Sequence, residues 1–261
     1  MALAMDTLGW LLLAAFVAGF IDAMAGGGGL LTLPALLAAG IPPVPAIATN
    51  KLQGCFGTGG AFLAYWRRGL IDLRPFALAA GVAFAGSAAG AVAVQHADPT
   101  FVAGIVPVLL VAMAAYFLFA PAMGEADRHA RLGRFALLVP IAAVGFYDGF
   151  FGPGTGSFFT VALVALGGLG LVRAIAHAKL LNFATNLSAL GAMVAGGQVL
   201  WSVGLPMAAA SVLGNQAGVL TAVRFKGRGV RVLLVVISLA LTIRLLSDPA
   251  NPLRTALTGR T

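Results

Sequence analysis

The feature that most constrains this chain is a succession of apolar segments separated by short polar stretches. A helix needs about 20 apolar residues to cross the hydrocarbon core of a bilayer, and shorter apolar runs are often re-entrant or buried. Only 9% of the residues are charged, too few to cover a soluble protein of 261 residues. The sequence therefore predicts an all-α integral membrane protein, a multipass helical bundle. Its apolar segments are expected at 8–24, 29–40, 44–66, 75–96, 100–121, 135–151, 155–169, 173–195, 203–223 and 230–247.

The net charge of +8 has a different meaning in such a chain than in a soluble protein. The basic residues form short clusters between apolar segments, which favours contact with anionic membrane lipid and not with nucleic acid. Before the first apolar segment the only charge is on Asp6, so the basic region of a secretory signal is missing and we expect an uncleaved first segment. Cys55 is the single cysteine, so no intrachain disulfide can form.

An internal repeat divides the chain into two halves of five segments. The first half is expected at 1–121, a cytoplasmic linker at 122–134, and the second half at 135–261. One glycine cluster in each half corresponds to the other, with Gly26 and Gly28 matching Gly152 and Gly154. Further matching stretches are 19–22 with 145–148 (GFID and GFYD), 46–48 with 174–176 (both AIA), 51–52 with 179–180 (both KL), and Gly86 and Gly90 with Gly214 and Gly218.

Loop charges indicate that the two halves are inverted. The loop at 67–74 holds three arginines, whereas its counterpart at 196–202 has no basic residue. One loop later the pattern reverses, since 96–100 lacks Lys and Arg while 224–231 holds four basic residues. Because basic loops stay in the cytoplasm, only an inverted repeat with a cytoplasmic linker at 122–134 satisfies all of these loops.

We expect the protein in the inner (plasma) membrane. The inverted arrangement then places both termini on the outer side of that membrane. Arg254 and Arg260, in the C-terminal tail, conflict with this orientation. A homodimer is left open, because nothing in the sequence fixes the oligomeric state.

Two glycine-rich breaks are the first candidates for a substrate site. Irregular backbone inside a membrane is tolerated only where it is buried in protein or lines a wet cavity, and inverted repeats place substrate sites near the midplane at such breaks. Glycine lets several backbone N–H groups point at one anion, at or near a helix start. Leu30 and Ser157 are expected to begin the helices that follow. The predicted substrate-binding residues here are Gly26, Gly27, Gly28, Gly29, Gly152, Gly154, Gly156, Thr155 and Ser157.

The alternative reading of these glycines is that they only let helices cross closely, as GxxxG pairs do. For the paired breaks we favour the functional reading. For Gly86 and Gly90 we favour close packing.

Lys51 and Lys179 are the second candidates, since each lies inside an apolar segment at a matching repeat position. Charges inside a membrane are costly and usually functional, so these lysines would attract an anion or form a gating pair. The alternatives are snorkelling to the interface or a purely structural ion pair. Asn50 and Asn182 lie beside the lysines and are weaker candidates for substrate contact.

Asp22 and Asp148 each precede a glycine cluster by four residues. A carboxylate would repel an anionic substrate, so coupling or gating is expected in place of direct binding. Three roles are open: neutralising a lysine of the other half (Asp22 with Lys179 and Asp148 with Lys51), carrying a coupling proton, or capping free amides at the break.

No catalytic, metal or cofactor site is expected. The chain has one cysteine, three scattered histidines and neither an HExxH nor a GxSxG motif, so we do not expect an enzyme. His177 is expected to be packed and hydrogen-bonded. No Walker motif is present, so ATP-driven transport would need a partner.

Four stretches resemble the TauE/SafE family of sulfite and organosulfonate transporters, also called TSUP. They are GFIDAMAGGGGLLTLPALLAAG at 19–40, AIATNKLQG at 46–54, GFYDGFFGPGTGSF at 145–158 and AIAHAKLLNFATN at 174–186. The likeness extends from about residue 8 to residue 247 and is greatest to the YfcA-like branch.

The resemblance implies a multipass plasma-membrane carrier, usually an exporter, of sulfur-containing anions such as sulfite, thiosulfate or sulfonates. It also implies that the two glycine breaks and the AIATNK and AIAHAK stretches line the pathway. The leading hypothesis is a secondary anion transporter that works by alternating access, and the alternative is an anion-selective channel with the same midplane pore. The halves are not identical, since Thr49 and Asn50 are replaced by His177 and Ala178, so the site is expected to be asymmetric.

Overall fold

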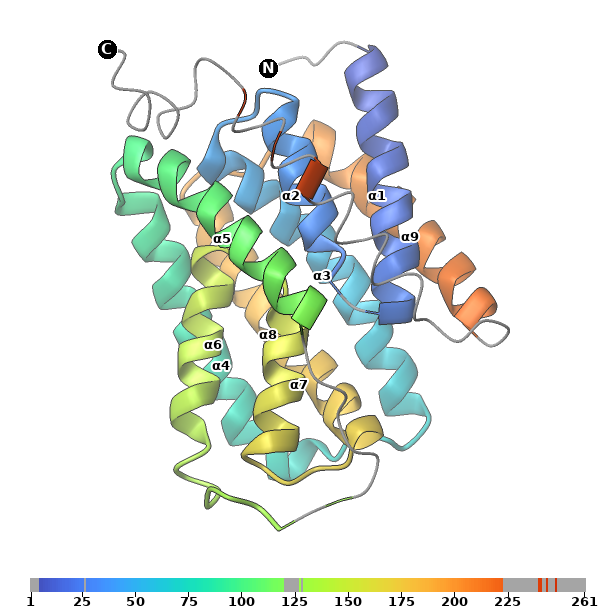
Figure 1. Cartoon of the computed structure of the whole chain (residues 1–261), viewed down its shortest axis with the longest axis vertical. Coiled ribbons are helices and arrows are strands. Elements are labelled where there is room, and N and C mark those ends of the chain that lie inside the picture. The colour runs from blue at the N-terminus through green and yellow to red at the C-terminus, as the bar shows by residue number, and fades with distance from the viewer. Residues whose placement is uncertain are drawn as a thin grey trace.

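The computed structural model describes residues 5–25, 27–119, 127, 129–222, 239–240, 243 and 247 (Figure 1). Every regular element in this part of the chain is a helix, which confirms the all-α prediction. The helices are α1 (Met5–Ala25), α2 (Gly29–Ala38), α3 (Pro43–Arg67), α4 (Leu73–His96), α5 (Pro99–Phe119), α6 (Leu138–Phe150), α7 (Thr155–Ala165), α8 (Leu171–Ala195) and α9 (Trp201–Ala222).

These helices coincide with the first nine predicted segments to within a few residues, and α2 and α7 are as short as expected. Several predictions fall outside the described residues. They concern Gly26, residues 122–126 and 128 of the linker, the basic residues at 224–231, most of the tenth segment at 230–247, and Arg254 and Arg260.

The centre of the bundle is formed by α3 and α8, which pack against each other. Each has 25 residues and is about 37 Å long, enough to cross a hydrocarbon core of about 30 Å. In the described part of the chain, α1, α4 and α5 are the helices apolar and long enough to be membrane spans by composition alone. The two central helices carry more polar side chains and are covered by α4, α7 and α9.

Four of the remaining helices form two closely packed pairs, α1 with α9 and α4 with α6 (Figure 1). A Cβ atom added to Gly86 or Gly90 of α4 would overlap carbonyl oxygens of α6. At the other pair, a Cβ atom on Gly214 would overlap the carbonyl oxygen of Phe16. Glycine is therefore required by the close backbone approach in both pairs, which confirms the packing interpretation of Gly86 and Gly90.

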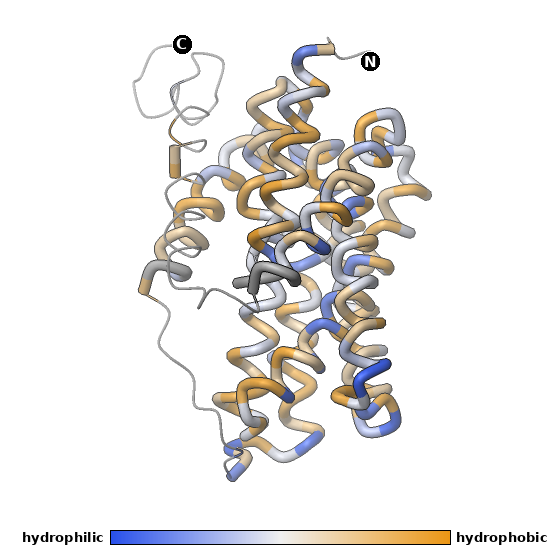
Figure 2. The backbone as a smooth tube through the Cα atoms, turned by 90° about the vertical axis from the view of Figure 1, so that its right-hand side faces the viewer, coloured by the Kyte–Doolittle hydropathy of each residue, from blue (hydrophilic) through white to orange (hydrophobic). Residues whose placement is uncertain are grey.

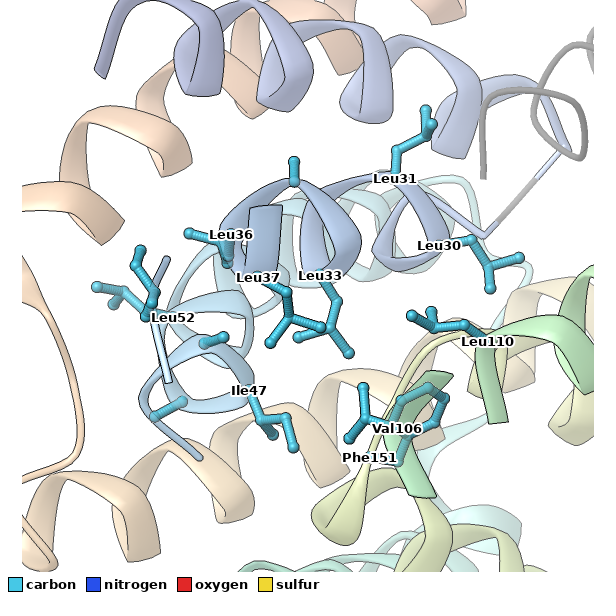
Figure 3. Close-up of a cluster of buried hydrophobic side chains, with 14 of the residues drawn as sticks. Leu30, Leu31, Leu33, Leu36, Leu37, Ile47, Leu52, Val106, Leu110 and Phe151 are labelled. Carbon is cyan, nitrogen blue, oxygen red and sulfur yellow. The ribbon is translucent and has the colours of Figure 1, made fainter. Parts of the chain in front are cut away.

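The short helix α2 lies inside the bundle. Its residues 30–37 are all buried, as expected for a helix that is apolar on every side. Figure 3 shows Leu30, Leu33 and Leu37 on the side of α2 that faces α3, α5 and the end of α6. The residues on that side are Ile47, Val106, Leu110 and Phe151. The break that precedes α2 is consequently held within protein, away from the lipid.

The loop at 67–74 and the described part of the linker meet at one end of the bundle. The backbone N–H of Asp72 donates to Nε2 of His177 at 3.1 Å, and the Arg134 guanidinium donates to the carbonyl oxygen of Pro75 at 3.0 Å. At the same end Arg173 pairs with Asp127 at 2.8 Å. Figure 2 shows hydrophilic residues gathered mainly toward the ends of the bundle, with a few at mid-height between apolar helices.

Candidate functional site

The two glycine breaks lie against each other in the structure. A Cβ atom built on Gly29 would stand 3.4 Å from Cα of Pro153 and 3.5 Å from Nδ2 of Asn50. Gly27 and Gly152 have φ angles of +92° and +102°, a region that L side chains rarely adopt. Glycine thus lets the chain leave α1 and α6 abruptly, so that α2 and α7 begin near one another.

The helices after the breaks begin at the first residues of the predicted apolar segments, α2 at Gly29 and α7 at Thr155. Leu30 and Ser157, the expected first helical residues, lie one and two positions further along. A glycine with positive φ precedes each helix, Gly27 before α2 and Gly154 directly before α7.

Lys51 and Asp148 form the first of two ion pairs at the breaks. Nζ of Lys51 lies 2.8 Å from Oδ1 of Asp148, and each side chain is only 1% exposed. Lys51 comes from α3 of the first half and Asp148 from α6 of the second, which confirms the predicted pairing between halves. Because Lys51 is enclosed by protein, the snorkelling alternative is wrong for this residue.

Neighbouring groups hold this pair in place. The hydroxyl of Thr155 donates to Oδ1 of Asp148 at 2.6 Å and lies at the same distance from the carbonyl oxygen of Gly152. A Cβ atom on Gly152 would stand 2.5 Å from Nζ of Lys51, so glycine is also required here by the lysine. Oδ2 of Asp148 is buried without a hydrogen-bond partner.

Thr155 was predicted as a hydroxyl donor to the substrate, and its geometry differs from that prediction. Its hydroxyl lies within hydrogen-bonding distance of two groups of the protein, the Asp148 carboxylate seven residues earlier on α6 and the carbonyl oxygen of Gly152 in the break. The sequence held no signal for this contact, which depends on how sharply the break turns. Ser157 is partly buried in the first turn of α7.

Lys179 and Asp22 form the second ion pair, again between the halves. Nζ of Lys179 lies 3.4 Å from Oδ2 of Asp22, and the side chains are 14% and 22% exposed. The other oxygen, Oδ1 of Asp22, accepts a hydrogen bond from the backbone N–H of Gly28 at 3.2 Å. Asp22 therefore both pairs with a lysine and caps an amide at the break, two of the three roles that the sequence left open.

Asn50 and Asn182 stand beside the two breaks. The hydroxyl of Thr32 donates to Oδ1 of Asn50 at 2.6 Å, a contact that sequence reasoning missed because Thr32 lies in an otherwise apolar helix. Oδ1 of Asn182 accepts a hydrogen bond from Nδ2 of Asn186, one turn later in α8, at 3.0 Å. Nδ2 of Asn182 points toward Gly156, with 3.3 Å between that nitrogen and a Cβ atom built on the glycine.

His177 is packed and satisfied, as predicted. Its ring stacks on Phe76 with centroids 3.9 Å apart, and its nitrogens contact the carbonyl oxygen of Arg173 and the backbone N–H of Asp72. The structure thus brings both breaks, both lysines, both aspartates and Asn50 and Asn182 to the interior of the bundle. Gly26 lies outside the described residues.

The arrangement suits binding and release of ions more than bond chemistry. Each lysine is matched by one carboxylate, so the two pairs are neutral as they stand. Backbone amides at the starts of α2 and α7 and the amide nitrogens of Asn50 and Asn182 are neutral donors near these pairs. An anion that enters must therefore compete with a carboxylate for a lysine.

Comparisons with known proteins agree on the class of protein. The sequence matches the family model described as "Sulfite exporter TauE/SafE" over residues 11–245. A probable membrane transporter protein, ORF9 of Sinorhizobium sp, is 48% identical over 255 residues, which is 97% of this chain and 97% of the relative.

Two further relatives are described in the same terms. The probable membrane transporter protein YfcA of Escherichia coli K12 is 42% identical over 92% of this chain and 90% of its own length. A probable membrane transporter protein of Haemophilus influenzae is 43% identical over 95% of this chain and 98% of its own length. No solved structure matches this chain significantly.

Proposed function

The chain belongs to the TauE/SafE family of membrane transporters, and we propose that it is a secondary transporter of small sulfur-containing anions in the inner (plasma) membrane. The observation that carries this proposal is the pair of lysine–aspartate contacts at the two breaks, each joining one half of the chain to the other. Charges inside apolar helices are costly, and two matched pairs indicate ion transfer more than simple packing.

The chemistry of the donors supports an oxyanion as the substrate. Lysine ammonium groups and amide N–H groups donate hydrogen bonds, and sulfite, thiosulfate and sulfonates present acceptor oxygens. Gly29, Asn50, Gly156 and Asn182 provide neutral donors close to the pairs. The family description names sulfite, which supports a substrate of the same chemical class.

The inverted repeat is the second part of the proposal. The loop after α3, the described part of the linker and the start of α8 meet at one end of the bundle through Asp72, Arg134 and Arg173. We assign this basic end to the cytoplasm. Rocking of one half against the other around the breaks would then expose the site alternately to each side.

Counterflow in proteoliposomes tests the function. Purified protein is reconstituted and uptake is measured with labelled sulfite, thiosulfate, methanesulfonate and sulfoacetate, with protein-free liposomes as the control. We expect saturable uptake that is accelerated by the same anion inside the vesicles. Uptake that neither saturates nor responds to internal anion would indicate the channel alternative, and no protein-dependent flux of any of the four would contradict the proposal.

A further inference from the structure

The two lysine–aspartate pairs occupy matching places in the repeat, yet their surroundings differ in ways that the sequence encodes. Thr155 follows the second break at the place where Gly29 follows the first. Its hydroxyl donates to Oδ1 of Asp148, so this oxygen has two donors, Lys51 and Thr155. Gly29 offers no side chain, and among the described residues the hydrogen-bond donors to Asp22 are Lys179 and the backbone N–H of Gly28.

Burial by protein follows the same division. Lys51 and Asp148 are sealed within the bundle, whereas Lys179 and Asp22 are partly exposed and their charged atoms are 3.4 Å apart. The second pair therefore has surface that protein does not cover in this conformation. The first pair can be reached only if the halves separate around it.

The electrostatic surroundings of Asp22 are simple. The helices packed against α1 are α9 and α2, and their described residues, 201–222 and 29–38, include no ionisable side chain. On α8, Arg173 is paired with Asp127, and His177 is held by the loop at Asp72. Among the described residues, Lys179 is thus the charge that faces Asp22.

We propose that Lys179 is the cation that receives the transported anion, and that Asp22 releases Lys179 by taking up a proton, so that proton and anion travel together. This inference rests on the proposed transport function. The proton comes from water and ends on the Asp22 carboxyl, while Lys179 stays an ammonium ion. No other bond forms or breaks.

Charge balance is the reason for the coupling. The empty site is neutral, with one ammonium and one carboxylate. An added monovalent anion, such as hydrogensulfite or methanesulfonate, would leave a net negative charge among apolar helices, which is unfavourable, whereas a proton on Asp22 restores neutrality. For a divalent anion such as thiosulfate, the proton removes one of the two excess negative charges. The protonated carboxyl still accepts the Gly28 N–H, so the break keeps its cap. The Lys51–Asp148 pair stays closed and joins the halves.

The test measures proton and anion movement together. Proteoliposomes containing a pH-sensitive dye receive sulfite, thiosulfate, methanesulfonate or sulfoacetate under an imposed pH gradient, with the membrane potential clamped by valinomycin and potassium. For wild type we expect acid outside to accelerate anion uptake and protons to enter with the anion. In Asp22→Asn, the acceleration by acid should fall at least ten-fold, and residual uptake should follow the membrane potential.

Two variants serve as controls. Asp22→Glu keeps a titratable carboxyl and should restore the response to the pH gradient. Asp98→Asn changes an exposed carboxylate that caps α5 through the N–H groups of Thr100 and Phe101, and it should behave as wild type because asparagine also caps. Comparing each variant with wild type under the same gradient cancels any protonation of the anion itself.

The outcomes separate this inference from the function on which it rests. If wild type moves none of the four anions, the proposed function fails. If wild type moves an anion without proton entry, or if Asp22→Asn keeps the full response to acid, the coupling role of Asp22 is overturned and the transport function stands. Gel filtration and thermal melting confirm folding. If Asp22→Asn does not fold, proton entry with wild type alone decides.

Discussion

The Lys51–Asp148 and Lys179–Asp22 pairs use the same two residue types at matching places of the two halves, but only the first is sealed from water. Its charged atoms are 2.8 Å apart in side chains that are 1% exposed, against 3.4 Å and exposures of 14% and 22% in the second pair. The difference teaches that a repeated motif need not repeat its role, because the neighbours of each carboxylate decide how tightly it is held.

Breaking the ion pair is expected to cost more stability for Lys51–Asp148 than for Lys179–Asp22. Removing one partner of a buried ion pair leaves an uncompensated charge and costs about 3–5 kcal/mol, whereas exposed pairs contribute about 0–1 kcal/mol. The first pair therefore suits a fixed joint between the halves. The second suits a contact that opens in each transport cycle.

The largest expected effect is that of Lys51→Ala on stability. It leaves the Asp148 carboxylate buried without its counter-ion, and we expect a loss of about 3–5 kcal/mol that appears as a marked drop in melting temperature in detergent. The double variant Lys51→Met with Asp148→Asn removes both charges and should regain most of the loss. A melting temperature of Lys51→Ala close to that of wild type would contradict the description of a sealed pair.

Removing the hydroxyl of Thr155 is expected to have an intermediate effect. Thr155→Ala takes one of two donors from Oδ1 of Asp148, and hydrogen bonds to charged groups contribute about 1.5–3 kcal/mol. Thr155→Ser keeps the hydroxyl and is the matched control. Thermal melting of the two variants checks this, and equal melting temperatures would show that the hydroxyl does not distinguish the two pairs.

The smallest effect on stability is expected for Lys179→Ala, below about 1 kcal/mol, because water can solvate the Asp22 carboxylate that remains. The effect on transport should be large, in contrast to the small effect on stability. We expect anion uptake to fall at least about ten-fold, because the anion loses a charge-assisted donor. Melting and uptake are measured on the same preparation. Unchanged uptake in this variant would remove Lys179 from the substrate site.

Much of the fold could be predicted from hydropathy alone. The first nine segments were located to within a few residues, because an apolar run of membrane-spanning length can hardly form anything other than a helix. The pairing of Asp22 with Lys179 and of Asp148 with Lys51 followed from the repeat. The contacts of Thr155 and Thr32 could not be predicted in this way, since hydroxyls in apolar helices give no local signal of their partners.

The sequence by itself determined the membrane class, the positions of the helices and the two breaks. These are properties of neighbours along the chain or of its internal repeat. Pairing of the aspartates with lysines was one of three roles that the sequence left open. Only the tertiary structure decided that both pairs form and which of them is fully enclosed by protein. Accessibility depends on how closely segments far apart in the sequence approach, such as Asp22 and Lys179 at 157 positions from each other, and no local pattern records that distance.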